Sequence, residues 1–268
     1  MTTNKTSVHK LWAVIFTGLV SVLFQTSAIA WDGFSPYRED EKPKAFSNQV
    51  FAEPGWDAAY EVLTIKTKDG FSIHYNEAEN GEAVLVGAKN NVLASAKGLG
   101  KPMWGVCVVE GDFNQDGKPD FALMMGNGGN GMAADFGQWV FYLSCPTGYK
   151  PAILDTDTID LDDLIELGND GCLRILHTSL VDVPSGVTVS GGRQLYFYIY
   201  RLLRVKGTDF EEDRVADPRF PKIVAYMRWS QQQNHKETKL LSAAQKVELL
   251  KDHPIKIRQG ADALRADP

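Results

Sequence analysis

Short runs of branched and aromatic residues, separated by turn signals, recur through most of the chain. Residues 60–67 and 71–75 are such runs, and Lys68-Asp69-Gly70 lies between them. Asp-Gly between two runs of this kind favours a β-hairpin, because glycine accepts the positive φ that tight turns require. The pattern therefore predicts antiparallel strands joined in a meander.

Six further segments have the same strand-like composition. They are residues 83–87, 104–110, 121–125, 138–144, 173–183 and 195–205. The last segment holds five large apolar or aromatic residues in succession, from Tyr196 to Tyr200. Such a run favours a strand that is buried on both faces, although a buried helical turn is the alternative.

The last third of the chain has helical spacing instead. Residues 221–234 and 242–251 are the two predicted helices, and Ser242 with Gln245 forms a capping box at the start of the second. The fold class is therefore predicted as mainly β, an antiparallel meander arranged as an incomplete propeller or a sandwich, with a helical C-terminal appendage. The predicted organisation is a β-rich calcium-binding domain at 31–215, the appendage at 216–260 and a disordered tail at 261–268.

The N-terminus has the features of a secretory signal peptide. Lys5 and Lys10 precede an apolar run at residues 11–24, and small residues precede a cleavage point between Ala30 and Trp31. Residues 1–30 are therefore predicted to be removed, which implies a secreted or periplasmic protein. An uncleaved membrane anchor is the alternative, because residues 11–30 have about the length that spans a bilayer.

The charge of the chain narrows the classes of partner. The sequence has 28 basic and 34 acidic side chains. Removal of residues 1–30 takes away two lysines and no acid, which leaves 26 basic and 34 acidic side chains and a net charge of −8. This balance argues against a general nucleic-acid binder and suits a soluble monomer without membrane contact after cleavage, although it does not fix the oligomeric state.

One loop carries the clearest chemical signal. Residues 111–120 read Gly-Asp-Phe-Asn-Gln-Asp-Gly-Lys-Pro-Asp. Counted from Asp112 as position 1, oxygen side chains occupy loop positions 1, 3, 5 and 9. A glycine occupies position 6, and the residue at position 7 offers its backbone carbonyl. Calcium takes six to eight oxygen ligands, and alternate residues of a tightly curled loop can direct their oxygens inward together.

The flanks of this loop distinguish it from an EF-hand. Position 12 is Leu123 instead of a bidentate glutamate, and the segments on both sides read as strands. Residues 111–125 resemble the FG-GAP or VCBS-type repeat of integrin-like β-propellers, although such propellers need several repeats. The resemblance implies Ca²⁺, in a structural role, held by Asp112, Asn114, Asp116, the Lys118 carbonyl and Asp120. An ordinary polar turn without metal is the alternative.

A second acidic segment, from Asp155 to Asp163, lacks the glycine and the spacing of such a loop. It is predicted to form an acidic turn before a strand at residues 164–167. The cysteines leave two possibilities: Cys145 and Cys172 lie beside turn residues and are the more plausible disulfide pair, or all three thiols, Cys107 included, are reduced.

Catalytic motifs are scarce in this sequence. The histidines are scattered, and the glycine-rich segment at 126–131 lacks the spacing of a phosphate-binding loop. That segment is instead predicted to form a ligand surface with its neighbours, namely Trp104, Asn127, Asn130, Asp135 and Trp139. The predicted function is a calcium-binding module that contacts a protein or a glycan. The alternative is a calcium-dependent hydrolase that uses acids such as Asp155 and Asp157.

Overall fold

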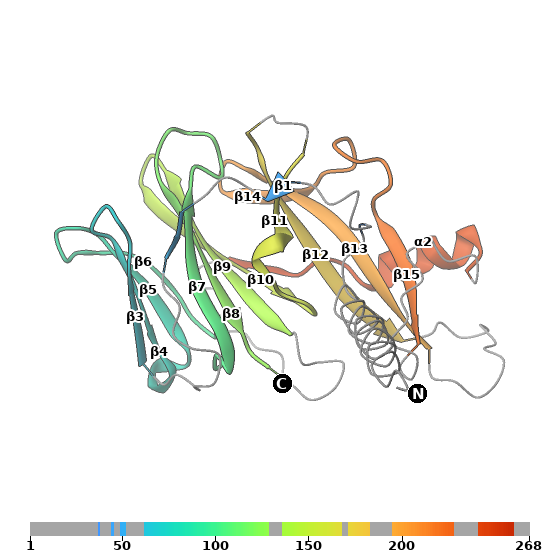
Figure 1. The fold of residues 1–268 in the computed structure, drawn as a ribbon, viewed down its shortest axis with the longest axis horizontal. Coiled ribbons are helices and arrows are strands. Elements are labelled where there is room, and N and C mark those ends of the chain that lie inside the picture. Colours follow the sequence, from blue (N-terminus) through green and yellow to red (C-terminus); the bar gives the residue numbers. More distant parts are fainter. Residues whose placement is uncertain are drawn as a thin grey trace, which may run out of the picture.

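The computed structural model describes the chain in segments. These are residue 37 and residues 44–45, 49–51, 62–128, 136–167, 171–182, 195–227 and 241–259. Most of their regular structure is antiparallel strand, which forms three sheets (Figure 1), so the mainly β prediction is confirmed. The predicted signal peptide and the predicted tail at 261–268 lie outside these segments.

The first sheet is a four-stranded meander. It contains β3 (Val62–Lys66), β4 (Ser72–Asn76), β5 (Glu82–Val86) and β6 (Val92–Ala96), paired in that order, with the short 3-10 helix η2 (Glu77–Glu79) between β4 and β5. Gly70 in the β3–β4 turn has a φ of 81°, the left-handed value that the Asp-Gly pair predicts.

The second sheet is built around another meander. Its central strands are β7 (Trp104–Gly111), β8 (Asp120–Gly126), β9 (Gly137–Cys145) and β10 (Gly148–Thr156), again in sequence order. Two short strands extend it, β2 (Gln49–Phe51) beside β7 and β16 (Ile257–Gln259) beside β10.

The third sheet repeats the arrangement. Its consecutive strands are β11 (Leu164–Glu166), β12 (Leu173–Asp182), β13 (Leu195–Lys206) and β14 (Asp209–Glu212), with the 3-10 helix η4 (Leu161–Asp163) before β11. β1 (Lys44–Ala45) pairs with β11, and β15 (Lys222–Met227) pairs with the first half of β13.

The second sheet lies between the other two. On one face, Val108 belongs to a core shared with Ile73 of the first sheet, and on the other face Phe141 belongs to a core shared with Leu203 of the third. Figure 1 shows the three sheets in a row with β7–β10 in the middle. Because both faces are covered, every residue of β8 is buried, which explains its continuous apolar sequence.

The long aromatic strand β13 is buried on both faces, as its sequence predicts. Phe197 and Ile199 pack in one core with Leu249, whereas Tyr198 and Tyr200 pack in another on the opposite face. These four side chains are fully shielded from solvent.

The C-terminal region is only partly helical. The helix α2 (Ala243–Asp252) begins at Ser242 with the predicted capping box. The prediction of a helix over 221–234 is wrong at residues 222–227, which form β15, while residues 228–234 lie outside the described segments. Ile223 and Val224 pack into cores on opposite faces of the third sheet, and the backbone of β15 pairs with β13. A strand satisfies these groups on both faces, whereas a helix would bury a single stripe.

The segment from α2 to β16 connects all three sheets. Arg201 of β13 donates from Nη2 to the carbonyl of His253 at 2.6 Å, just after α2. β16 then pairs with β10 of the second sheet. Arg258 of β16 donates to the carbonyl of Gly98, which follows the first sheet, at 2.9 Å.

Candidate calcium-binding hairpin

The predicted metal-binding loop connects two adjacent strands of the middle sheet. β7 and β8 are antiparallel, and Gly111 with Asp120 is the last pair before the loop. The flanking segments are therefore strands, as the sequence predicts, and the loop is the end of a β-hairpin. Residues 113–118 form a series of bends in the described backbone.

The backbone of the loop curls sharply at two positions. Gln115 has a φ of 61° and Gly117 a φ of 82°, both in the left-handed region. At Gly117 a Cβ atom would meet no other atom within 4 Å, so the glycine is needed there for its conformation and not for space.

The polar side chains of the loop fold over this curl. Asp112 accepts hydrogen bonds from the backbone N–H groups of Asp116 and Gly117, each at 2.9 Å. Asn114 Oδ1 also accepts from the N–H of Asp116, at 3.1 Å, and Asp116 Oδ1 accepts from that of Lys118, at 2.9 Å. The first three predicted ligand side chains are therefore held along the inside of one turn by its own amides.

Asp120, the last predicted ligand, is completely buried. Its relative exposure is 0%, and its carboxylate accepts hydrogen bonds from the N–H groups of Phe113, Asn114 and Ser144, at 2.7, 3.1 and 2.6 Å. Burial raises the pKa of Asp120, and these hydrogen bonds act in the opposite direction. The three amides position this carboxylate beneath the loop.

The loop is attached to strands on both sides. Asn114 Nδ2 donates to the Ser144 carbonyl of β9 at 2.9 Å, and the Tyr149 hydroxyl of β10 donates to the Pro119 carbonyl at 3.0 Å. Burial, together with the negative charges of Asp120, Asp116 and Glu110, raises the pKa of Tyr149 to about 12. Acidic side chains therefore lie near Tyr149 on the side of the loop.

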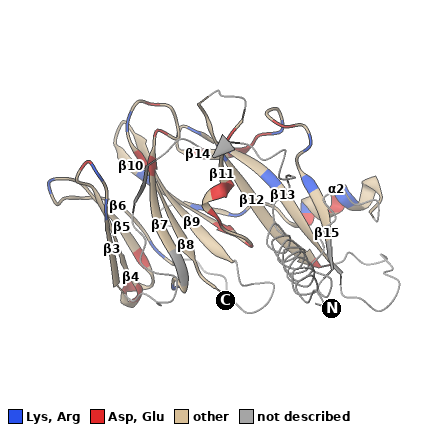
Figure 2. Cartoon of the chain, viewed as in Figure 1, with Lys and Arg blue, Asp and Glu red and all other residues tan. Residues whose placement is uncertain are grey.

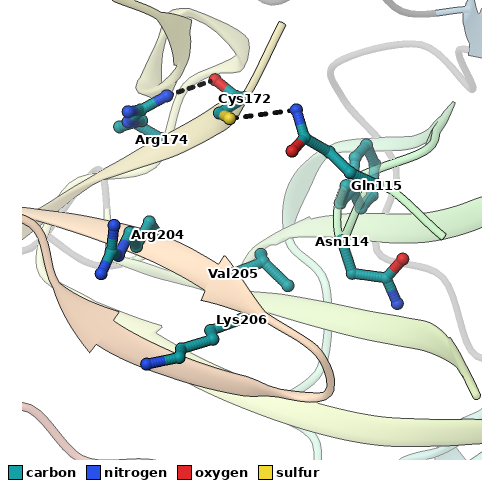
Figure 3. Close-up of a pocket in the computed structure, with 8 residues that line it drawn as sticks. Asn114, Gln115, Cys172, Arg174, Arg204, Val205 and Lys206 are labelled. Carbon is teal, nitrogen blue, oxygen red and sulfur yellow. Dashed lines mark hydrogen bonds between the residues drawn. The ribbon is translucent and has the colours of Figure 1, made fainter. Parts of the chain in front are cut away.

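A pocket of about 210 Å³ separates the loop from the third sheet (Figure 3). Asn114 and Gln115 line it from the loop, and Gln115 Nε2 donates to Cys172 Sγ across it at 3.0 Å. Its remaining lining residues are Phe113, Arg174, Arg204, Val205 and Lys206. The polar groups that the described residues contribute to this lining are amides, cations and a thiol.

The cations of this pocket have acidic partners outside its lining. Arg204 and Lys206 both pair with Glu211, and Arg174 pairs with Asp213 at 3.0 Å. Figure 2 shows acidic and basic residues interspersed over the described elements, and this group of cations lies in one small area among them.

The donor chemistry of the loop fits calcium, because the side chains of Asp112, Asn114, Asp116 and Asp120 and the Lys118 carbonyl all offer oxygen. Among the described residues no group of three or more His, Cys, Asp and Glu side chains is placed to hold a metal ion on its own. The carboxylates of Asp112, Asp116 and Asp120 are therefore not grouped closely enough in this structure to form such a site. The fit therefore rests on the oxygen donor set and the curled backbone.

The structure describes only part of the predicted ligand surface around residues 126–131. Trp139 is only 1% exposed and packs against Phe141 in the core, so its place on an exposed surface is corrected. Asn127 is half-buried next to Gly100, where a Cβ would come within 2.5 Å of the Asn127 amide. Trp104 lies in β7, its side chain is outside what is described, and Asn130 and Asp135 lie outside the described segments.

The acids of the alternative hydrolase prediction have structural partners. Asp155 accepts from Arg258 at 2.9 Å and from Gln138 at 2.7 Å. Asp157 accepts from the N–H of Leu180 at 2.6 Å, and its pKa is raised mainly by burial. The following acidic segment forms η4 and then β11, in agreement with the predicted turn and strand.

No disulfide joins any two of the three cysteines in the structure, which agrees with the reduced alternative. Cys107 is buried, as predicted, whereas Cys145 and Cys172 are half-buried. Hydrogen bonding, chiefly from Thr147, lowers the pKa of Cys145.

A buried polar pair on the third sheet is not predicted by any sequence motif. His177 of β12 and Arg201 of β13 are direct cross-strand neighbours, and both are buried. His177 Nε2 contacts the carbonyl of Asp155 at 3.0 Å. Burial, together with the positive charge of the nearby Arg201, lowers the pKa of His177 to about 4. Only the pairing of distant strands brings these residues together.

Comparisons with models of known protein families, with curated proteins and with solved structures find no match for this chain. The resemblance of residues 111–125 to an FG-GAP or VCBS-type repeat therefore remains a prediction. No helix within the described segments is long and apolar enough to cross a membrane.

Proposed function

We propose that the chain is an exported calcium-binding β module in which the hairpin loop holds one structural Ca²⁺. The ligands would be the side chains of Asp112, Asn114, Asp116 and Asp120 and the Lys118 carbonyl. The observation that carries this proposal is the fully buried Asp120 carboxylate, which lies beneath a curled loop of oxygen donors. Bound calcium would supply positive charge to an acidic loop that has backbone amides as its main partners.

The ion would act as a cross-link. The loop contacts Ser144 of the middle sheet and Cys172 of the third sheet, so a rigid loop would stabilise the boundary between the two sheets. Calcium in extracellular modules is often bound with Kd values of about 10⁻⁴–10⁻³ M, which suits exported proteins.

Terbium offers a direct test, because it replaces calcium in oxygen sites and its emission is sensitised by a nearby tyrosine. Tyr149 contacts the loop, so excitation of the purified protein should yield terbium emission that added calcium removes. Asp116→Ala should reduce this emission. Glu248→Gln, which removes a charge from the exposed surface of α2, is the matched control and should leave it unchanged.

We further propose that the module contacts an acidic group of a protein or glycan through the pocket next to the loop. Support comes from the amides and cations that the described residues contribute to its lining. A volume of about 210 Å³ lies below the roughly 300–1,000 Å³ of pockets for drug-sized ligands, so the pocket suits one acidic group or a single ring. Binding to an array of acidic and neutral glycans, compared between the parent protein and Lys206→Ala, tests this assignment. Equal binding by both proteins would refute it.

The hydrolase alternative has weaker support. Asp155 is engaged by Arg258 and Gln138, and Asp157 by a backbone amide, so both acids already have structural partners.

A further inference from the structure

A second set of oxygen atoms lies where the first sheet meets the base of the hairpin. Glu110 is the residue of β7 that comes two positions before Asp112. Val106 and Val108, at alternate positions of the same strand, pack in the core between the first and second sheets. Because alternate residues of a strand share a face, the Glu110 side chain also faces the first sheet.

The β3–β4 turn of the first sheet lies opposite Glu110. Thr67 opens this turn, and its N–H donates to the Phe71 carbonyl at 2.9 Å. The ring of Phe71 lies 5.0 Å from that of Phe121, centroid to centroid, and Phe121 is the cross-strand neighbour of Glu110. These contacts bring the turn that carries Thr67 and Asp69 against Glu110.

Two oxygen atoms at this boundary are buried without a partner. Glu110 is 8% exposed and Thr67 is 7% exposed. Glu110 Oε2 and Thr67 Oγ1 are both shielded from solvent, and neither forms a hydrogen bond of normal geometry with a described residue. A buried carboxylate oxygen is costly unless a well-formed hydrogen bond or a positive charge replaces its lost water.

The charges around Glu110 do not compensate for its burial. The negative charge of Asp69 acts on Glu110 from the β3–β4 turn, whereas the Thr67 hydroxyl and the Lys68 charge act in the opposite direction. Lys68 and Asp69 are both exposed in the turn, and no ion pair joins Lys68 to Glu110 in the described part of the chain. A positive charge between the two acids would satisfy both.

We propose that Glu110, Asp69 and Thr67 form a second cation site, which takes a hard divalent cation between the first and second sheets. Two carboxylates and a hydroxyl are hard oxygen ligands, and water completes the coordination of calcium or magnesium at sites with few protein ligands. The site shares no ligand with the hairpin loop. It joins the first sheet to the middle sheet, whereas the loop joins the middle sheet to the third.

The test counts bound ions on the purified protein. Calcium and magnesium are titrated separately by calorimetry, and the number of ions is checked by equilibrium dialysis with elemental analysis. The parent protein should bind two divalent ions. Glu110→Gln and Asp69→Asn should each bind one, and the exposed position of Asp69 makes its variant a safeguard against loss of folding. Glu248→Gln on α2 changes the same charge elsewhere and should still bind two.

The ion counts distinguish failure of the hairpin proposal from failure of the second-site proposal. If the hairpin loop binds no metal, the parent binds one ion that Asp69→Asn removes and Asp116→Asn retains, and the second site stands. If the count stays unchanged in both Glu110→Gln and Asp69→Asn, the second site is overturned, whatever the loop does.

Discussion

The Asp120 carboxylate of the hairpin loop accepts a hydrogen bond of 2.6 Å from the backbone N–H of Ser144, on the neighbouring strand β9. This contact joins the last acid of the loop to a different strand of the middle sheet. The same carboxylate also accepts from Phe113 and Asn114 within the loop. Asp120 is therefore a structural anchor of the hairpin as well as a proposed calcium ligand.

Asp120→Ala should destabilise the protein even in the presence of chelator. The variant leaves the three amides that Asp120 now satisfies without an acceptor, and hydrogen bonds to charged groups contribute about 1.5–3 kcal/mol each, so a total loss of roughly 2–4 kcal/mol is expected after relaxation. Urea unfolding measures the loss. Asp116→Ala, at an exposed position, should cost less than about 1 kcal/mol under the same conditions. Equal losses in both variants would contradict the anchoring role of Asp120.

Gly117→Ala should weaken calcium binding through the backbone alone. Its φ of 82° is left-handed and the space around it is open, so the cost is conformational, about 1 kcal/mol. Calorimetry should show an affinity about fivefold lower. Lys118→Ala is the control, because the proposed ligand there is the backbone carbonyl, and its affinity should equal that of the parent. A large loss in Lys118→Ala would show that the side chain takes part.

His177 predicts a pH dependence of stability. Its folded pKa of about 4 lies below the ordinary value of 6.5, so between these values the unfolded state binds the proton and the folded state does not. The contribution of neutral His177 to the free energy of unfolding is complete above about pH 6.5. It is lost as the pH falls toward 4, by up to roughly 3 kcal/mol.

Urea midpoints from pH 7.5 to 4.5 measure this effect. His177→Gln should have a flatter pH profile than the parent, because glutamine does not titrate. His74→Gln, at an exposed position where both ring nitrogens have hydroxyl partners, should keep the parent slope. Identical profiles for the parent and His177→Gln would refute the assignment.

Tyr142→Phe should loosen the contact between the first two sheets. The Tyr142 hydroxyl of β9 donates to the Ala83 carbonyl of β5 at 2.7 Å, and this bond is buried. Its removal leaves the carbonyl without this donor and should cost about 1–2 kcal/mol, measured as a shift of the urea midpoint. An unchanged midpoint would mean that the bond does not stabilise the stack.

Local signals in the sequence predicted the elements that depend on local physics. The Asp69-Gly70 turn, the capping box of Ser242 and the doubly buried run of β13 each follow from a few neighbouring residues. The loop conformation at Gly117 belongs to the same class. These features need no knowledge of distant strands.

Features that depend on the stacking of sheets were not accessible in this way. Trp139 was placed on a ligand surface, but the third sheet covers the face of β9 that carries it. Residues 222–227 have apolar spacing that fits a short helix, and only the free edge of β13 determines that they pair as a strand. The approach of Ser144 to Asp120, and that of Glu110 to the β3–β4 turn, likewise arises from contacts between separate strands.

The most direct test of the calcium hairpin is thermal unfolding of the purified protein in chelator and in millimolar calcium, with Asp116→Ala measured alongside. Binding to the folded state alone should stabilise the parent by about 1.4–2.7 kcal/mol at tenfold to hundredfold excess over Kd. The account predicts an upward shift of the parent Tm that Asp116→Ala reduces. An unchanged parent Tm, or a shift of equal size in both proteins, would show that the loop does not hold the ion.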